Sequence, residues 1–379
     1  MPTELQNIAS PQAVAAVWNT NVNEQPTYLY QVLLEDEVVN GTAVNVVFGK
    51  DQGLSVLDMV TEDASSTRMK NQGFREATYK LNQFKKHMLV DERTRRAVND
   101  ALARATSQYE QQAIVRTQLQ DALKLFNNAS VTREYLFTEG LVNGKIDFSK
   151  YPNASSNEIV DFFYDPEQFT TVDKDWGNKD STPVDDVNNF TQKLSNDLGV
   201  AFKSAIMNRT TYNKLIHSGQ IVNTLGVGVG SNNIALSNAQ AESIFNDATG
   251  LNIMIYDKSI GGKKFIPDGK VVLVPDVEVQ KIGSMAHTET QEQMGLAGNT
   301  GYDVATTTDG ITVTTSVIDD PVGVKYQVSE VFLPLIKASN NVGVMTVLTG
   351  NDNGAKDVTP ASTTTDNSAN NSTDNKGGK

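Results

Sequence analysis

One stretch of the sequence, residues 251–276, constrains the fold strongly because it combines two strand patterns with two turns. Apolar residues alternate with less apolar ones over 251–255, as in a half-buried strand. Residues 271–274 are continuously apolar, which is typical of a strand covered on both faces. Between these runs, the Gly-Gly pair at 261–262 tolerates positive φ, and Pro-Asp-Gly at 267–269 reverses the chain. We therefore expect a two-stage hairpin that leads into a core strand.

The composition indicates a globular protein. A chain of 379 residues with 39% hydrophobic content can bury a substantial core and has room for two or three domains. No apolar run approaches the ~18 residues of a membrane span, and no basic and apolar leader opens the sequence, so we expect synthesis in the cytosol without a membrane partner. The absence of cysteine excludes disulfides, thiolate metal sites and cysteine nucleophiles.

The net charge of −13 is distributed unevenly along the chain. Residues 68–96 hold nine basic and three acidic residues, a local +6 that leaves −19 for the remainder. An acidic body disfavours binding to nucleic-acid phosphates. We interpret the basic stretch as a surface that contacts acidic groups on another copy of the chain. The candidate contact residues are Arg68, Lys70, Arg75, Lys80, Lys85, Lys86, Arg93, Arg95 and Arg96.

A long helix is expected over residues 91–126, which contain no Gly or Pro and have apolar residues at a 3.6-residue period. Such a helix has about 36 residues and is roughly 54 Å long. Arg116 and Gln120 interrupt its apolar stripe, which predicts a bend or partial exposure there. We expect a break at residues 127–128, then a short helical piece that ends near Gly140.

Residues 1–40 have few structural signals and are interpreted as an arm that depends on neighbours for order. The β-prone runs 43–48 and 74–81 predict a long two-stranded ribbon, which is marginally stable alone. Helices are expected from Thr182 and over 208–217 and 237–249, alternating with strands in a mixed α/β layer.

The tail, residues 351–379, contains few apolar residues and is expected to be disordered.

The sequence YDKSIGGKKFIPDGKVVL at 256–273 resembles a signature of the lambda-type major capsid proteins of tailed bacteriophages, the major capsid protein E family. A second resemblance is Trp-Gly-Asn-Lys-Asp at 176–180 followed by Thr-Pro-Val-Asp-Asp at 182–186. The motifs follow one another in the family's order over roughly residues 49–350. The resemblance implies an α+β protein with the Hong Kong phage-type capsid fold.

The same resemblance implies a division of the chain into the parts of that fold. The long helix would be the spine helix, and the ribbon would be the E-loop, which lies across the adjacent subunit. The expected parts are an N-terminal arm (1–40), the E-loop (41–90), a peripheral domain (91–182 and 301–333), an axial domain (183–300 and 334–350) and the tail (351–379).

The function implied by the resemblance is self-assembly into an icosahedral head shell that encloses double-stranded DNA. The family implies on the order of hundreds of copies as hexamers and pentamers. It also implies a portal protein, a separate scaffolding protein and possible decoration proteins. The expected location is the virion, after assembly in the host bacterial cytoplasm. An acidic inner wall would repel the packaged duplex.

Two other functions are weighed: an encapsulin-like nanocompartment, which shares the fold, and a nucleotide- or metal-dependent enzyme. For an enzyme, the candidates are the Gly-rich loop 226–230, the acidic residues within 161–186 and three separated histidines. The loop lacks phosphate-loop spacing, and the acids lack calcium-loop spacing. We therefore expect no catalytic residue, cofactor or metal site.

Two single features remain. Trp176 is read as an anchor that packs a loop onto the core. Some relatives carry a Lys–Asn isopeptide cross-link between subunits. Lys50 and Lys70 are compatible with such a cross-link in this chain, but the sequence singles out no asparagine as the partner.

Overall fold

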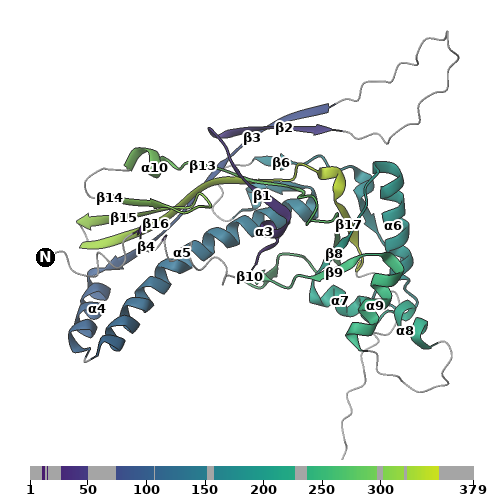
Figure 1. Cartoon of the computed structure of the whole chain (residues 1–379), viewed down its shortest axis with the longest axis horizontal. Helices are drawn as coiled ribbons and strands as arrows, with labels where there is room; N and C mark the ends of the chain where they lie inside the picture. The colour runs from purple at the N-terminus through teal and green to yellow at the C-terminus, as the bar shows by residue number, and fades with distance from the viewer. Residues whose placement is uncertain are drawn as a thin grey trace, which may run out of the picture.

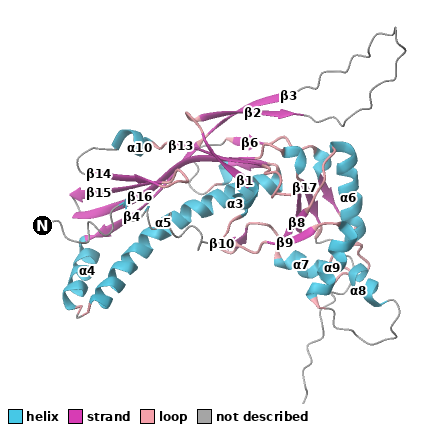
Figure 2. Cartoon of the chain, viewed as in Figure 1, coloured by secondary structure: helices cyan, strands magenta, loops and turns pink. Residues whose placement is uncertain are grey.

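Two packed sheets with flanking helices form the fold in the computed structural model (Figures 1 and 2). The structure describes residues 11–12, 15, 27–49, 74–105, 107–151, 158–226, 237–296, 302–319 and 322–349. In Figure 1, helix α5 (Gln108–Asn143) runs along the large sheet, and helices α6 to α9 gather around a smaller sheet at the other end. Within the described residues, no helix is long and apolar enough to cross a bilayer.

The large sheet is built around its longest strand, β16, which has strands on both sides. At Val331 and Phe332, β16 pairs with β13 on one side and β4 on the other; its first half pairs with β15 and β4. All these pairs are antiparallel, whereas β1 adds to β13 in parallel. The strands are β1 (Leu34–Val38), β4 (Asn82–Asp91), β13 (Gly283–Thr288), β14 (Tyr302–Thr306), β15 (Thr312–Asp319) and β16 (Val322–Leu335).

The long helix lies further along the chain than the sequence indicates. Helix α4 (Glu92–Arg104) ends where we expected continuity, and α5 starts after Ser107, whose side chain accepts a hydrogen bond from the Glu110 backbone N–H. The expectation of one helix over 91–126 was therefore wrong. A serine N-cap can begin a new helix without Gly or Pro, because it satisfies a backbone donor that the first turn leaves free.

The expected break at residues 127–128 is also absent, because α5 continues to Asn143 and ends at Gly144, which has φ +69°. Tertiary packing sustains this part of the helix. Phe126 and Phe137 are fully buried, and Gly140 lies so close to Phe162 that an added Cβ would be 2.7 Å from its ring. Burial of apolar side chains outweighs the weak helix propensity of two asparagines.

The smaller sheet has the order β7-β17-β12-β8-β9 and apolar cores on both faces. Val272 and Val274 join one core while Val271 and Leu273 join the other, which confirms the predicted two-sided strand. Its strands are β7 (Phe169–Thr171), β8 (Ser204–Met207), β9 (Asn252–Ile255), β12 (Lys270–Val274) and β17 (Gly343–Thr346). Its helices are α6 (Pro183–Leu198), α7 (Arg209–Ile216), α8 (Gly219–Gly226) and α9 (Asn238–Thr249).

The predicted hairpin is only partly correct. Strands β10 (Ser259–Ile260) and β11 (Lys263–Lys264) form its tip, and Gly261, Gly262 and Gly269 all have positive φ as expected. However, β9 and β12 do not pair, because β8 lies between them. All four residues of β8 are buried, so this strand is suited to a central position.

The N-terminal segment is docked on its own subunit at the residues that the structure describes, contrary to the expected dependence on neighbours. Gln12 donates to the Val304 carbonyl at 3.4 Å, and Tyr28 is buried. Helix α3 (Leu29–Leu33) buries Leu29 and Leu33 in the main core, and β1 follows directly.

The remaining elements are β2 (Ala43–Gly49), β3 (Phe74–Lys80), β5 (Lys145–Asp147), β6 (Ile159–Asp161), α10 (Gln291–Leu296), and the 3-10 turns η2 (Phe148–Lys150), η3 (Pro166–Gln168) and η4 (Ser339–Asn341). Residues 351–379 lie outside the described residues.

Candidate subunit interface

The predicted ribbon is present as the antiparallel pair β2–β3, with Val44 opposite Tyr79 and Phe48 opposite Arg75. These residues share one face, and Val44, Phe48 and Tyr79 are buried. The other face carries Val47, which is 57% exposed. The ribbon therefore has an inner face against its own subunit and an outer face left open. Residues 50–73, which connect the two strands, lie outside the described residues.

The stem of the ribbon is held by an aromatic contact with the segment after β6. Phe163 packs edge-on against Phe48, and the Arg75 guanidinium lies 4.5 Å from the centroid of the Phe163 ring. Phe163 has φ +56°, a left-handed conformation that is costly for a non-glycine residue, and the Asp161 carboxylate accepts its backbone N–H at 2.8 Å. The strain indicates that surrounding contacts fix the Phe163 ring beneath the ribbon.

The structure distributes the nine candidate contact residues over three elements and the undescribed loop. Arg68 and Lys70 lie outside the described residues. Arg75 and Lys80 are on β3, Lys85 and Lys86 on β4, and Arg93, Arg95 and Arg96 in the first turns of α4. Arg75 lies over the Phe163 ring of its own chain. The exposed members are Arg75, Lys80, Lys85, Lys86, Arg93 and Arg96.

Lys85 also has a partner within its own subunit, the carboxylate of Glu292 on α10. The same carboxylate accepts hydrogen bonds from Gln327 at 3.1 Å and Ser329 at 3.2 Å. Burial raises the pKa of Glu292, but Lys85 and the hydrogen bonds outweigh burial and hold this pKa below its ordinary value. Lys85 therefore fastens α10 to the large sheet within its own subunit, and its contact with another copy stays a prediction.

Two buried acids that sequence reasoning missed connect α5 to the rest of the subunit. Glu330 of β16 accepts from Arg133 at 2.9 Å, and burial raises the pKa of Glu330 to about 7 against the opposing charge of Arg133. The neighbouring Glu134 accepts the backbone N–H groups of Leu29 and Tyr30, which start α3. The one sequence signal was the presence of adjacent charges on the buried stripe of a long helix.

The residues that were considered for catalysis or metal binding make local contacts with other residues of the chain, where the structure describes them. Trp176 is fully buried and donates to Asp186 at 3.0 Å, which confirms it as an anchor. Asp175 accepts from the Thr349 backbone N–H at 2.7 Å. No cluster of His, Asp or Glu in the described part of the chain could hold a metal. The loop 227–236 lies outside it, as do Lys50 and Lys70.

The three histidines are separate. His287 is buried with Nε2 3.1 Å from the Asp36 carboxylate, His217 contacts the Asn213 carbonyl at 2.7 Å, and His87 is exposed on β4.

Comparison with solved structures defines the class of fold. The structure is similar to a putative prophage capsid protein of Escherichia coli CFT073, with a TM-score of 0.54, 12% identity, and 89% of this chain and 97% of that chain covered. It is also similar to a phage-related protein of Bordetella bronchiseptica RB50, with a TM-score of 0.50, 12% identity, and 87% and 95% covered. The fold is that of phage major capsid proteins, the Hong Kong phage-type fold.

The family follows from the sequence. The model of the family "Phage major capsid protein E" matches residues 10–340, and the chain belongs to this family of structural capsid proteins. It is a phage major capsid protein and is located in the virion. A search among curated proteins found no match. The encapsulin of Synechococcus elongatus PCC 7942 is a weaker structural match, with a TM-score of 0.38, 13% identity, and 84% and 86% covered.

Proposed function

We propose that this capsid protein assembles as hexamers and pentamers into an icosahedral shell around double-stranded DNA. The ribbon β2–β3 supports this most directly. Its inner face is packed on its own subunit, whereas its outer face exposes Val47. A two-stranded ribbon gains little stability alone. Its open outer face, where Val47 lies among the exposed polar residues Asn45 and Thr78, therefore favours a covering surface, and a second subunit would supply one.

In this proposal the parts of the chain have the roles expected from the family. Within residues 41–90, expected as the E-loop, the ribbon and its connection (43–80) cross the adjacent subunit, because β4 belongs to the large sheet of its own subunit. Residues 91–182 with 301–333 form the peripheral domain, and residues 183–300 with 334–350 form the axial domain. Residues 29–38 of the expected N-terminal arm belong to the subunit body, as do Gln12 and Tyr28, which contact it.

The charge of the chain supports its role as a DNA container. A net charge of −13 weakens adhesion of the enclosed duplex to the wall. The remaining partners in the proposal are a portal protein, a separate scaffolding protein and possible decoration proteins. Assembly takes place in the host bacterial cytoplasm, and no membrane takes part.

The basic residues that remain exposed provide the test of assembly through charge. Expressed wild-type protein should form capsomers or closed shells in electron micrographs, and raised salt should weaken their formation. The variant Lys86→Glu/Arg93→Glu should keep the circular dichroism of the folded subunit and lose shell formation. A wild-type chain that stays monomeric would contradict the proposal. A double variant that assembles normally would remove these two residues from the interface.

A further inference from the structure

One edge of the large sheet is a short acidic strand. Strand β1 has the sequence Leu-Glu-Asp-Glu-Val and pairs with β13 alone among the described strands. Glu35 is exposed, and Val38 is 71% exposed. An edge strand presents backbone N–H and C=O groups on which a further strand can add, unless charge or cover prevents it. Acidic side chains favour a basic strand as the one that adds.

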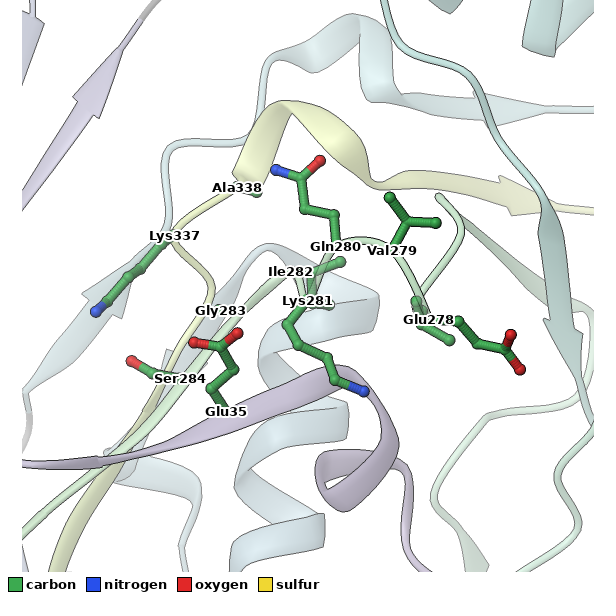
Figure 3. Close-up of a pocket in the computed structure, with 11 residues that line it drawn as sticks. Glu35, Glu278, Val279, Gln280, Lys281, Ile282, Gly283, Ser284, Lys337 and Ala338 are labelled. Atoms are coloured by element: carbon green, nitrogen blue, oxygen red, sulfur yellow. The ribbon is translucent and has the colours of Figure 1, made fainter.

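The charge of this edge is only partly neutralised within the subunit. Glu37 accepts from Lys337 at 2.7 Å, and Asp36 lies 3.1 Å from His287. In the described residues, Glu35 has no cation within ion-pair distance. Figure 3 shows Glu35 at a pocket that is also lined by Glu278, Lys281 and Lys337, whose volume is 480 Å³. Lys281 donates to the Val32 carbonyl and Lys337 to Glu37, so neither lysine pairs with Glu35. The edge therefore offers an accessible surface with excess negative charge.

The opposite edge of the same sheet carries the opposite charge. Strand β4 lies on the far side of β16 from β13 and β1. Its residues Lys86 and His87 are exposed, and Arg93 follows in the next helix. A body with a basic edge and an acidic edge on opposite sides attracts copies of itself head to tail. Such heterologous contacts close into a ring when the rotation between copies allows it.

We propose that the acidic edge β1 of one subunit receives the basic edge β4 of the next, with Glu35 of one copy against Lys86 of the other. The inference rests on the self-assembly proposed above and names the surfaces that meet. Charge complementarity selects a second copy as the occupant, because the chain itself carries the matching edge. Repetition around each capsomer multiplies a contact that is weak alone.

Disulfide trapping tests this contact directly, because the chain contains no cysteine. Glu35 and Lys86 lie three strand spacings apart across the sheet, roughly 14 Å at about 4.8 Å each, and they are also offset along β16, where they align with Leu335 and Val328. This separation is too large for a disulfide within one subunit. The variant Glu35→Cys/Lys86→Cys, treated with a mild oxidant, should give a ladder of covalent oligomers on denaturing gels. Each single-cysteine variant should lack the ladder. Shells or capsomers without a ladder would overturn the inference.

Charge exchange supplies the second measurement. Glu35→Lys and Lys86→Glu should each raise the protein concentration needed for assembly by at least about tenfold, and the combined variant should recover most of this loss. Asp180→Lys, an exposed acid away from this edge, should assemble as wild type. An unaffected Glu35→Lys variant, an unrescued combined variant or an equal effect of Asp180→Lys would each overturn the inference. Covalent oligomers in the absence of shells would contradict the proposed shell assembly and would still support the contact between β1 and β4.

Discussion

Gly310 occupies a position where the absence of a side chain allows two segments of the large sheet to approach each other. Its φ is +78°, and an added Cβ would overlap the imidazole of His287. That ring is buried and lies beside Asp36 of β1. Gly310 thus leaves room for the His287 ring, and the position of this ring beside Asp36 helps to dock the edge strand β1.

We predict that Gly310→Ala destabilises the subunit by more than the roughly 1–2 kcal/mol of a left-handed alanine, because a steric clash adds to the backbone strain. Gly199→Ala is the matched control, since Gly199 has φ +70° and open space around its Cβ direction. Thermal or urea unfolding of both variants measures the difference. Equal losses would show that the His287 ring moves aside without cost.

The Lys85–Glu292 pair makes a second prediction at this scale. Lys85→Met should lower the free energy of unfolding at pH 7 by up to about 1 kcal/mol, because the pair is partly exposed. The pKa of Glu292 is lowered in the fold, so its contribution is present above the ordinary value of 4.5 and is lost as pH falls below it.

The difference between wild type and Lys85→Met should therefore shrink below pH 4.5 in urea unfolding curves. Lys86→Met, an exposed neighbour on β4, is the control and should leave the stability unchanged. A difference independent of pH would remove Glu292 as the partner.

Among the elements, the ribbon combines a fixed stem with an open outer face. Its inner residues pack on the segment that contains Phe162 and Phe163, and Tyr79 donates to the Asp161 carbonyl. The position of the stem is therefore fixed by contacts within its own subunit. A neighbouring subunit would need to cover only the part of the ribbon that extends beyond the stem. This arrangement fixes the direction of the ribbon before assembly.

We predict that trypsin cleaves free subunits after Arg68 or Lys70 and that assembled shells protect both sites, because a neighbouring subunit then covers the loop. Mass spectrometry of the fragments identifies the sites. Strand β2 lacks basic residues, so trypsin does not cleave it. A chymotryptic digest run in parallel reports on peptide bonds within β2 and provides the reference. Equal protection in free subunits and shells would contradict the E-loop assignment.

The whole molecule is held together by cores that meet on the smaller sheet. Val272 and Val344 belong to the core shared with α5 and the large sheet, whereas Val271 and Met345 belong to the core under α6 to α9. The two ends of the subunit therefore share one buried sheet.

Truncation after Gly350 is predicted to leave both subunit stability and shell formation intact. Residues 351–379 contain few apolar side chains and can contribute little buried area. Sedimentation and electron microscopy of the truncated chain provide the measurement, with full-length protein as the reference. Loss of shells at unchanged melting temperature would give the tail a role in assembly.

Local sequence chemistry determined several features that the structure confirms. The helices after Asn208 and Ser237 begin with side-chain caps, and the helix that starts at Ser237 ends at Gly250 with φ +72°. The two-sided strand β12 and the ribbon pairing are also confirmed. Each depends on residues within a few positions, or on alternation along one strand, which the sequence displays directly.

Only the tertiary structure decided the features that depend on distant segments. The insertion of β8 between β9 and β12, the continuation of α5 through Asn127 and Asn128, and the pairing of Lys85 with Glu292 each join residues far apart in the chain. Their energies come from burial and from charge neutralisation between elements, which no local pattern encodes. The sequence by itself determined where elements start, stop and turn, whereas packing determined which of them became neighbours.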